Sequence, residues 1–190
     1  MEVGVLCLQG GYQKHIQILS EIGVKAKKVR YEDDLENIDG LILPGGESST
    51  LSKLIEKQNL YGKILKYLKE KPVYGTCAGL ILMSNNIANN SSVKTFNALD
   101  LTVSKNGWGR QVDSFIEDIK IDMFNEKFKA VFIRAPKIVK SSSSLEVLSS
   151  FMDTPIMVKS EKLLATTFHP ELTQDTRIHE YFIDMIKESN

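Results

Sequence analysis

The alternation of short apolar runs with helical periods in the first 80 residues constrains the fold more than any other feature of this sequence. Residues 3–8 and 40–43 are apolar runs that end near Gly or Pro, which is typical of strands buried on both faces of a parallel sheet. Between them, Ile16, Leu19 and Ile22 repeat at helical spacing before Gly23. Residues 73–75 form a further predicted strand. Functional loops of such a sheet lie at the carboxyl ends of its strands.

Two more helices are expected before residue 73 and a different pattern after residue 98. One helix begins near Ser48 or Ser49, and the next ends before Pro72. Closely spaced strands are then predicted at residues 101–105, 115–121, 130–133, 145–148, 156–158 and 163–167, some of them antiparallel. A last helix follows Asp175, and residues 85–92 and 141–144 are predicted as surface loops. We predict an α/β three-layer sandwich, flavodoxin-like, with a central mostly parallel sheet and some antiparallel strands.

Length and charge limit the possible functions. The 190 residues suit one domain spanning residues 1–190. Lysines and arginines number 24, as do aspartates and glutamates, so no net charge attracts nucleic acid or a membrane surface. The N-terminus lacks the pattern of a signal peptide, and no apolar run is long enough for a membrane helix. We therefore expect a cytosolic protein in which Cys7 and Cys77 are thiols, with no metal and no cofactor.

A glycine-flanked cysteine is the first candidate for catalysis. Residues 75–79, Gly-Thr-Cys-Ala-Gly, follow a predicted strand and open an apolar helical segment, which is the layout of a nucleophile elbow with Cys77 as nucleophile. The glycines permit a sharp turn, and the helix N-terminus favours a thiolate. An isolated cysteine is usually a small buried residue, but glycines two positions away on both sides favour the catalytic interpretation.

A thiol nucleophile needs a base, and the chain offers three histidines. His15 and His179 lie in predicted helices, and we interpret them as surface or boundary residues. His169 directly follows a predicted strand, within Phe-His-Pro-Glu. Glu171 can orient the imidazole and stabilise its charged form. Cys77, His169 and Glu171 are therefore the predicted catalytic triad.

A Pro-Gly-Gly turn at residues 44–46 lies at another strand-to-helix junction. Free backbone N–H groups at such a junction can receive a developing oxyanion, and Gly46 and Ala78 would be the donor pair. Many such turns are only tight turns, so the motif is weak alone. It lacks the Lys-Ser/Thr ending of a phosphate-binding loop.

Together, these three motifs resemble those of class I (triad) glutamine amidotransferases. Four further segments resemble the glutaminase subunits of pyridoxal 5′-phosphate synthase over essentially the whole chain: Leu8-Gln9-Gly10, residues 109–115 (Gly-Arg-Gln-Val-Asp-Ser-Phe), Phe132-Ile133-Arg134-Ala135-Pro136 and residues 168–173 (Phe-His-Pro-Glu-Leu-Thr).

The resemblance implies a function and a partner. Cys77 would attack the side-chain amide of L-glutamine, and the ammonia would pass to a (β/α)8 barrel synthase subunit that makes pyridoxal 5′-phosphate. It also implies glutamine-binding roles for the residues Gly46, Glu47, Ser48, Lys105, Ile133 and Arg134. Lys105 stands where the family has an arginine, so it keeps the charge but loses the bidentate fork. Arg110 is a possible substitute, and Trp108 is either a docking residue or part of the core or pocket wall.

Three other functions remain open at this stage. The chain could be the glutaminase of a different amidotransferase or another cysteine hydrolase. It could also be a noncatalytic assembly module, although such a module should have lost a member of the triad. The third alternative is a nucleotide binder on a doubly wound sheet, but this sequence lacks the phosphate-binding glycine pattern of such proteins.

Overall fold

The computed structural model describes residues 1–88, 92–108 and 114–189. Its strands are β1 (Glu2–Leu6), β2 (Lys25–Val29), β3 (Gly40–Leu43), β4 (Val73–Thr76), β5 (Ser84–Ile87), β6 (Leu99–Ser104), β7 (Ser114–Ile119), β8 (Phe128–Ile133), β9 (Lys137–Ser141), β10 (Glu146–Phe151), β11 (Thr154–Ser160) and β12 (Leu163–Thr166). Its helices are α1 (Tyr12–Glu21), α2 (Ser48–Lys57), α3 (Tyr61–Glu70), α4 (Ala78–Met83) and α5 (Arg177–Ser189), with short 3-10 turns η1 (Glu32–Leu35) and η2 (Pro170–Leu172).

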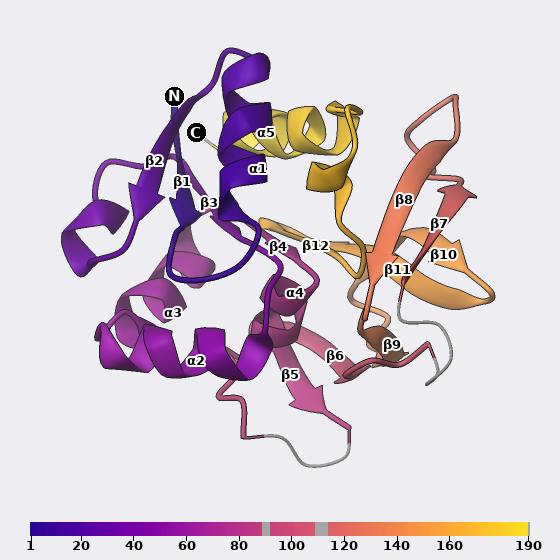
Figure 1. The fold of residues 1–190 in the computed structure, drawn as a ribbon, viewed down its shortest axis with the longest axis horizontal. Helices are drawn as coiled ribbons and strands as arrows, with labels where there is room; N and C mark the ends of the chain where they lie inside the picture. The colour runs from indigo at the N-terminus through magenta and orange to yellow at the C-terminus, as the bar shows by residue number, and fades with distance from the viewer. Residues whose placement is uncertain (89–91, 109–113, 190) are drawn as a thin grey trace.

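A seven-stranded sheet forms the middle of the molecule (Figure 1), in the order β10-β11-β12-β4-β3-β1-β2. The five strands from β12 to β2 run parallel, β11 pairs antiparallel with β12, and β10 pairs antiparallel with β11. Strands β5, β6 and β9 form a small second sheet, and β7 pairs with β8. The predicted mostly parallel sheet with antiparallel additions is confirmed.

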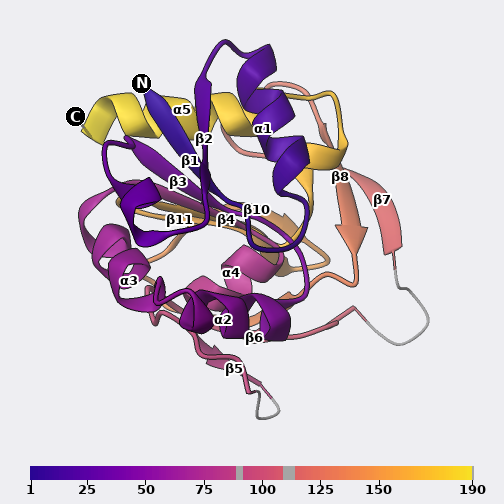
Figure 2. The ribbon, with the colours of Figure 1, turned by 60° about the vertical axis from the view of Figure 1, so that its left-hand side comes forward.

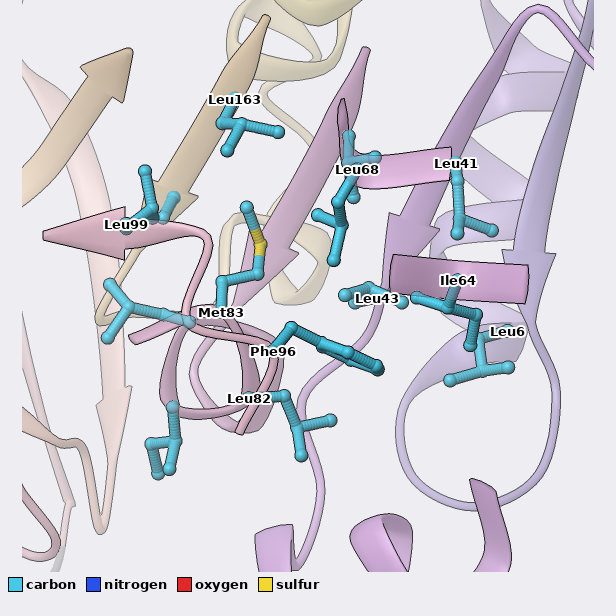
Figure 3. Close-up of a cluster of buried hydrophobic side chains, with 14 of the residues drawn as sticks. Leu6, Leu41, Leu43, Ile64, Leu68, Leu82, Met83, Phe96, Leu99 and Leu163 are labelled. Atoms are coloured by element: carbon cyan, nitrogen blue, oxygen red, sulfur yellow. The ribbon is translucent and has the colours of Figure 1, made fainter. Parts of the chain in front are cut away.

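Helices cover both faces of the central sheet, which makes three layers. Helices α1 and α5 lie on one face, and α2, α3 and α4 lie on the other (Figures 1 and 2). Successive side chains of a strand point to opposite faces. In β3, Leu41 and Leu43 join the apolar cluster beneath α2 and α3, while Ile42 joins the cluster beneath α1 and α5. Figure 3 shows side chains that converge on the first of these clusters, among them Leu43 of β3, Ile64 of α3 and Phe96 of the loop before β6.

Among the local predictions, those at β2 and β5 were wrong. Strand β2 was missed because its sequence, Lys-Ala-Lys-Lys-Val, is polar; it lies at an edge of the sheet, where only Val29 is buried. Residues 84–87 form β5 beside β6, not the start of a loop, because a neighbouring strand supplies their backbone partners. Helix α2 begins at Ser48, as predicted, and its N-cap is Glu47, whose carboxylate accepts the backbone N–H groups of both Ser49 and Thr50.

The topology gathers four functional loops. The neighbouring parallel strands β12, β4, β3 and β1 end within three residues of His169, Cys77, the 44–47 turn and Gln9, respectively. The carboxyl ends of parallel strands lie at one edge of a sheet. These loops therefore meet at one edge of the central sheet. Of the helices that the structure describes, none is long and apolar enough to cross a membrane.

Candidate active site

Cys77 occupies a strained elbow between β4 and α4, with φ 48° and ψ −97°. A residue other than glycine at positive φ costs about 1–3 kcal/mol and is retained where the surrounding structure enforces it. The packing around the elbow is close, because a Cβ at Gly79 would lie 2.1 Å from the Leu43 carbonyl oxygen. A Cβ at Gly75 would lie 2.6 Å from the Met83 sulfur. The two flanking glycines are therefore required for α4 to pack this closely behind the thiol.

His169 and Glu171 form a short hydrogen-bonded pair after β12. The His169 backbone N–H donates to the Val131 carbonyl at 2.8 Å, which ties this loop to β8. His169 Nδ1 lies 2.7 Å from Glu171 Oε1. The Glu171 carboxylate is buried, whereas 12% of the His169 side chain is exposed. Glu171 thus holds the imidazole at Nδ1, and part of the ring remains exposed to solvent.

The electrostatics of this pair favour a charged imidazole. Burial of His169 disfavours its charged form, but hydrogen bonds to Cys77 and Glu171 outweigh burial and raise the pKa of His169 to about 10. Burial also opposes ionisation of Glu171, yet the imidazoles of His15 and His169 hold the pKa of this carboxyl below its usual value. An imidazolium beside a thiol stabilises the thiolate and can give a proton to a leaving group.

A cleft of about 320 Å³ opens over Cys77 and His169. The other residues that line it are Gln9, Gly46, Glu47, Ser48, Ile81, Lys105, Asn106, Ile133 and Arg134. All six residues that were expected to bind glutamine therefore lie at one cleft with the expected nucleophile and base. Ala78, the second expected oxyanion donor, is the first residue of α4 and has a buried side chain next to Cys77.

The turn at residues 44–46 packs against the loop that follows β1. The Gly45 carbonyl accepts the Gly11 N–H at 2.9 Å, and a Cβ at Gly10 would lie 1.9 Å from the same oxygen. A Cβ at Gly45 would lie 2.3 Å from His169 Cε1. Glycines at residues 10 and 45 thus allow two loops and the base to approach one another closely.

Gln9 is a cleft residue to which we assigned no role from sequence. Its side-chain oxygen accepts the Glu47 N–H at 3.0 Å, so it fixes the turn that carries Gly46. Its position shortly after β1 and beside Gly10 was the sequence signal that could have indicated a role at the site. Ile81 and Asn106 also line the cleft, and nothing in their local sequence marks them.

Lys105 and Glu47 lie next to each other in the lining of the cleft. Lys105 Nζ donates to Ser49 Oγ at 3.0 Å and lies 3.6 Å from Glu47 Oε1. Burial opposes ionisation of Glu47, but hydrogen bonds from Thr50 and Ser49 dominate and lower its pKa to about 2. The Glu47 carboxylate is thus occupied as a helix cap, and Lys105 presents a cation at the cleft. Arg134 adopts φ 41° at the same cleft, whereas Arg110 lies outside the described residues.

The interpretation of His15 and His179 as surface or boundary residues was wrong. Both side chains are fully buried. His15 Nδ1 lies 2.9 Å from His179 Nε2, because α1 and α5 cover the same face of the sheet and bring the two rings together. Helical periodicity alone did not reveal that each polar ring has a buried partner.

Trp108 is half-buried beside Phe115, Phe132 and Phe151, and its ring N–H donates to the Pro136 carbonyl. It therefore forms part of an aromatic cluster at the β7–β8 pair. Both cysteines are free thiols, as expected. Within the described part of the chain, no group of three or more His, Cys, Asp or Glu side chains could hold a metal ion.

Known proteins resemble this chain along almost its entire length. Residues 5–188 match the SNO glutamine amidotransferase family. A protein of Thermosipho africanus named pyridoxal 5′-phosphate synthase subunit PdxT is 44% identical over 99% of this chain and 100% of its own length. A protein of the same name from Francisella tularensis subsp. novicida is 45% identical over 97% of this chain and 98% of its own length.

Solved structures agree with this relationship. A crystal structure of a glutamine amidotransferase superposes with a TM-score of 0.93 at 39% identity, covering 97% of this chain and 98% of that one. A second glutamine amidotransferase, from Thermotoga maritima, has a TM-score of 0.62 at 15% identity, covers 99% of this chain and 84% of its own, and shares the fold. On the sequence match and the close structural agreement, this chain belongs to the SNO glutamine amidotransferase family.

Proposed function

We propose that this chain is the glutaminase subunit of pyridoxal 5′-phosphate synthase, and that Cys77, His169 and Glu171 are its catalytic triad. The observation that carries the proposal is the placement of Cys77 on a strained elbow in the same cleft as His169, with Glu171 bonded behind the imidazole. Relatives that are 44% and 45% identical over nearly the full chain bear the name of that synthase subunit.

The reaction begins with attack of the Cys77 sulfur on the side-chain carbonyl carbon of glutamine. The carbon–nitrogen bond breaks, His169 donates a proton to the departing ammonia, and a glutamyl thioester remains. Water then attacks the thioester as His169 removes its proton, and glutamate leaves as the thiol is restored. Glu171 keeps the imidazole oriented and stabilises its charge.

The cleft provides groups suited to each part of glutamine. The backbone N–H groups of Gly46 and Ala78 would receive the oxyanion. The cations of Lys105 and Arg134 suit the α-carboxylate, and Ile133, Ser48 and the Glu47 backbone would form the remaining wall. Because the Glu47 carboxylate caps α2, we assign binding to its backbone and not to its side chain.

The partner in this proposal is the (β/α)8 barrel synthase subunit, which would take the ammonia inside the complex. The docking surface would surround the cleft mouth. Trp108 would support the cleft from the aromatic cluster more than it would anchor the interface, because its ring packs on three phenylalanines. A cytosolic location without nucleic acid or membrane partners is part of the proposal.

The test is ammonia release from glutamine by the purified chain mixed with the barrel synthase. We expect release that the synthase stimulates, and Cys77→Ala should abolish it. Cys7→Ala is the matched control, because Cys7 is also a buried thiol but lies outside the cleft and donates to the Val5 carbonyl of β1. Full activity of Cys77→Ala would refute the nucleophile.

The same assay separates the alternatives. Stimulation by a different acceptor enzyme, and not by the barrel synthase, would indicate a different amidotransferase. Absence of release with every acceptor would indicate a noncatalytic assembly module.

A further inference from the structure

Glu171 uses its two carboxylate oxygens on two different histidines. Oε1 lies 2.7 Å from Nδ1 of His169, and Oε2 lies 3.6 Å from Nε2 of His15 on α1. His15 Nδ1 lies in turn 2.9 Å from Nε2 of His179 on α5. His15 and His179 are fully buried, and Glu171 is only 2% exposed. A continuous line of polar groups therefore runs from the cleft into the protein interior.

The positions of the protons follow from the neighbours of each ring nitrogen. If His15 carries its proton on Nε2, this N–H faces both Glu171 Oε2 and Thr76 Oγ1, which lies 3.3 Å away. His15 Nδ1 then accepts the Nε2–H of His179. The opposite arrangement would place a lone pair of His15 against the carboxylate. It would also leave the Nδ1–H of His179 without an acceptor, because no described residue pairs with that atom.

Both rings are suited to remain neutral. Burial lowers the pKa of His15, despite the opposing effect of Glu171. Burial, with the neighbouring His15, lowers the pKa of His179 to about 3. A neutral His15 contributes an N–H dipole toward the carboxylate without adding a second positive charge that would compete with His169 for Glu171.

We propose that His15 is a positioning residue for the triad: its Nε2–H points its dipole at the second oxygen of Glu171 from 3.6 Å, so that the carboxylate stays ionised and aimed at His169. His179 fixes the tautomer of His15 that makes this possible. No described residue makes a hydrogen bond to Glu171 Oε2, and His15 Nε2 lies 3.6 Å from it. This inference rests on the proposed function only in assigning His169 to catalysis.

Other charged or titratable groups near Glu171 come from several elements. They are His169 beside it, Tyr74 of β4, His179 of α5, and Lys14 and Glu21 of α1, which share a surface depression with Glu171. Burial raises the pKa of Tyr74 well above its usual value, so the phenol stays neutral. Lys14 and Glu21 carry opposite charges, and Lys14 makes no ion pair with Glu171 in the described part of the chain. His169 and His15 therefore dominate the environment of this carboxylate.

The test is NMR titration of the histidine rings, which needs neither glutamine nor the synthase. The chain has only three histidines, so single variants assign the signals. In a Cys77→Ala background, Glu171 is the remaining bonded partner of His169, and the pKa of His169 should stay above 6.5. Adding His15→Phe should lower that pKa by about one unit, because Glu171 loses the N–H dipole that faces its Oε2 and its charge is less stable. His15→Gln should restore most of it, since the glutamine amide can place an N–H near the position of Nε2.

Two further readouts keep the test decisive. Ring nitrogen shifts of the unsubstituted protein should show His15 protonated on Nε2, and His179→Phe should make that tautomer mixed. In the active complex, His15→Phe should lower kcat roughly tenfold, as for supporting residues behind other site ligands, with little change in KM.

An Nδ1-protonated His15 would overturn the proposal, even if His15→Phe fails to fold. So would an unchanged His169 pKa in a folded His15→Phe variant, which would leave His15 as core packing. Neither result depends on whether the chain is a glutaminase.

Discussion

Substituting Gly79 by alanine tests the close packing that forms the elbow. Gly79 is the second residue of α4, and its added Cβ would lie 2.1 Å from the oxygen and 2.9 Å from the carbon of the Leu43 carbonyl. Real Cβ atoms essentially never approach a neighbour within 3.0 Å, so α4 and β3 must separate. Because β3 is a central strand with fully buried neighbours, neither element can yield easily.

The expected cost follows from two opposing terms. Overpacking a core costs about 1–3 kcal/mol, whereas alanine gains up to about 1 kcal/mol over glycine in a helix. We expect a net loss of about 1 kcal/mol, which corresponds to a melting temperature lower by roughly 3 °C in a domain of this size. A displacement of about 1 Å at the thiol should also reduce glutaminase turnover roughly 100-fold.

Gly62→Ala is the matched control, because Gly62 is the second residue of α3 and its added Cβ would meet nothing within 4 Å. The same substitution there should raise the melting temperature slightly and leave turnover unchanged. Thermal denaturation and ammonia release measure both variants. A Gly79→Ala protein that melts at or above the unsubstituted temperature with full turnover would refute the role of this close contact.

Three further predictions concern the charges at the cleft. Glu171→Gln should lower kcat by up to about 10⁴-fold, as the analogous change does in other triads. It should also move the alkaline limb of the pH–rate profile to lower pH. An unmoved limb would argue against an effect of Glu171 on the pKa of His169. The pKa of His169 is raised to about 10 in the folded chain, so its contribution to stability is complete below pH 6.5 and is lost as the pH rises toward 10. Denaturant unfolding of His169→Gln should therefore show a smaller loss of stability across this window than the unsubstituted chain, and equal losses would contradict the raised pKa. Lys105→Ala should raise KM for glutamine about tenfold, the loss expected for one charge-assisted contact. It should leave the melting temperature within about 1 °C, because the side chain is half-buried at the cleft and contacts the partly exposed groups of Ser49 and Glu47. An unchanged KM would remove Lys105 from the glutamine site.

The sequence alone determined the fold class, because the patterns that indicate strands and helices lie within short segments of the chain. Apolar runs such as residues 40–43 are buried on both faces, and helical periods between them require crossover connections to parallel strands. The elbow at Cys77 was also predictable, since glycines at fixed offsets report a turn that only a few residue types permit. The polar edge strand β2 could not be found in this way, because its backbone partners on β1 and not its side chains place it in the sheet.

Only the tertiary structure decided which polar residues share an environment. His15 and His179 are 164 positions apart in sequence, and each lies in an ordinary amphipathic helix. Packing of α1 and α5 on the same face of the sheet buries both rings and brings His15 to the far oxygen of Glu171. Likewise, Gln9 and Glu47 meet only because β1 and β3 are neighbours in the sheet. Local sequence carries the pattern that builds each element, whereas contacts between elements depend on the topology that places them side by side.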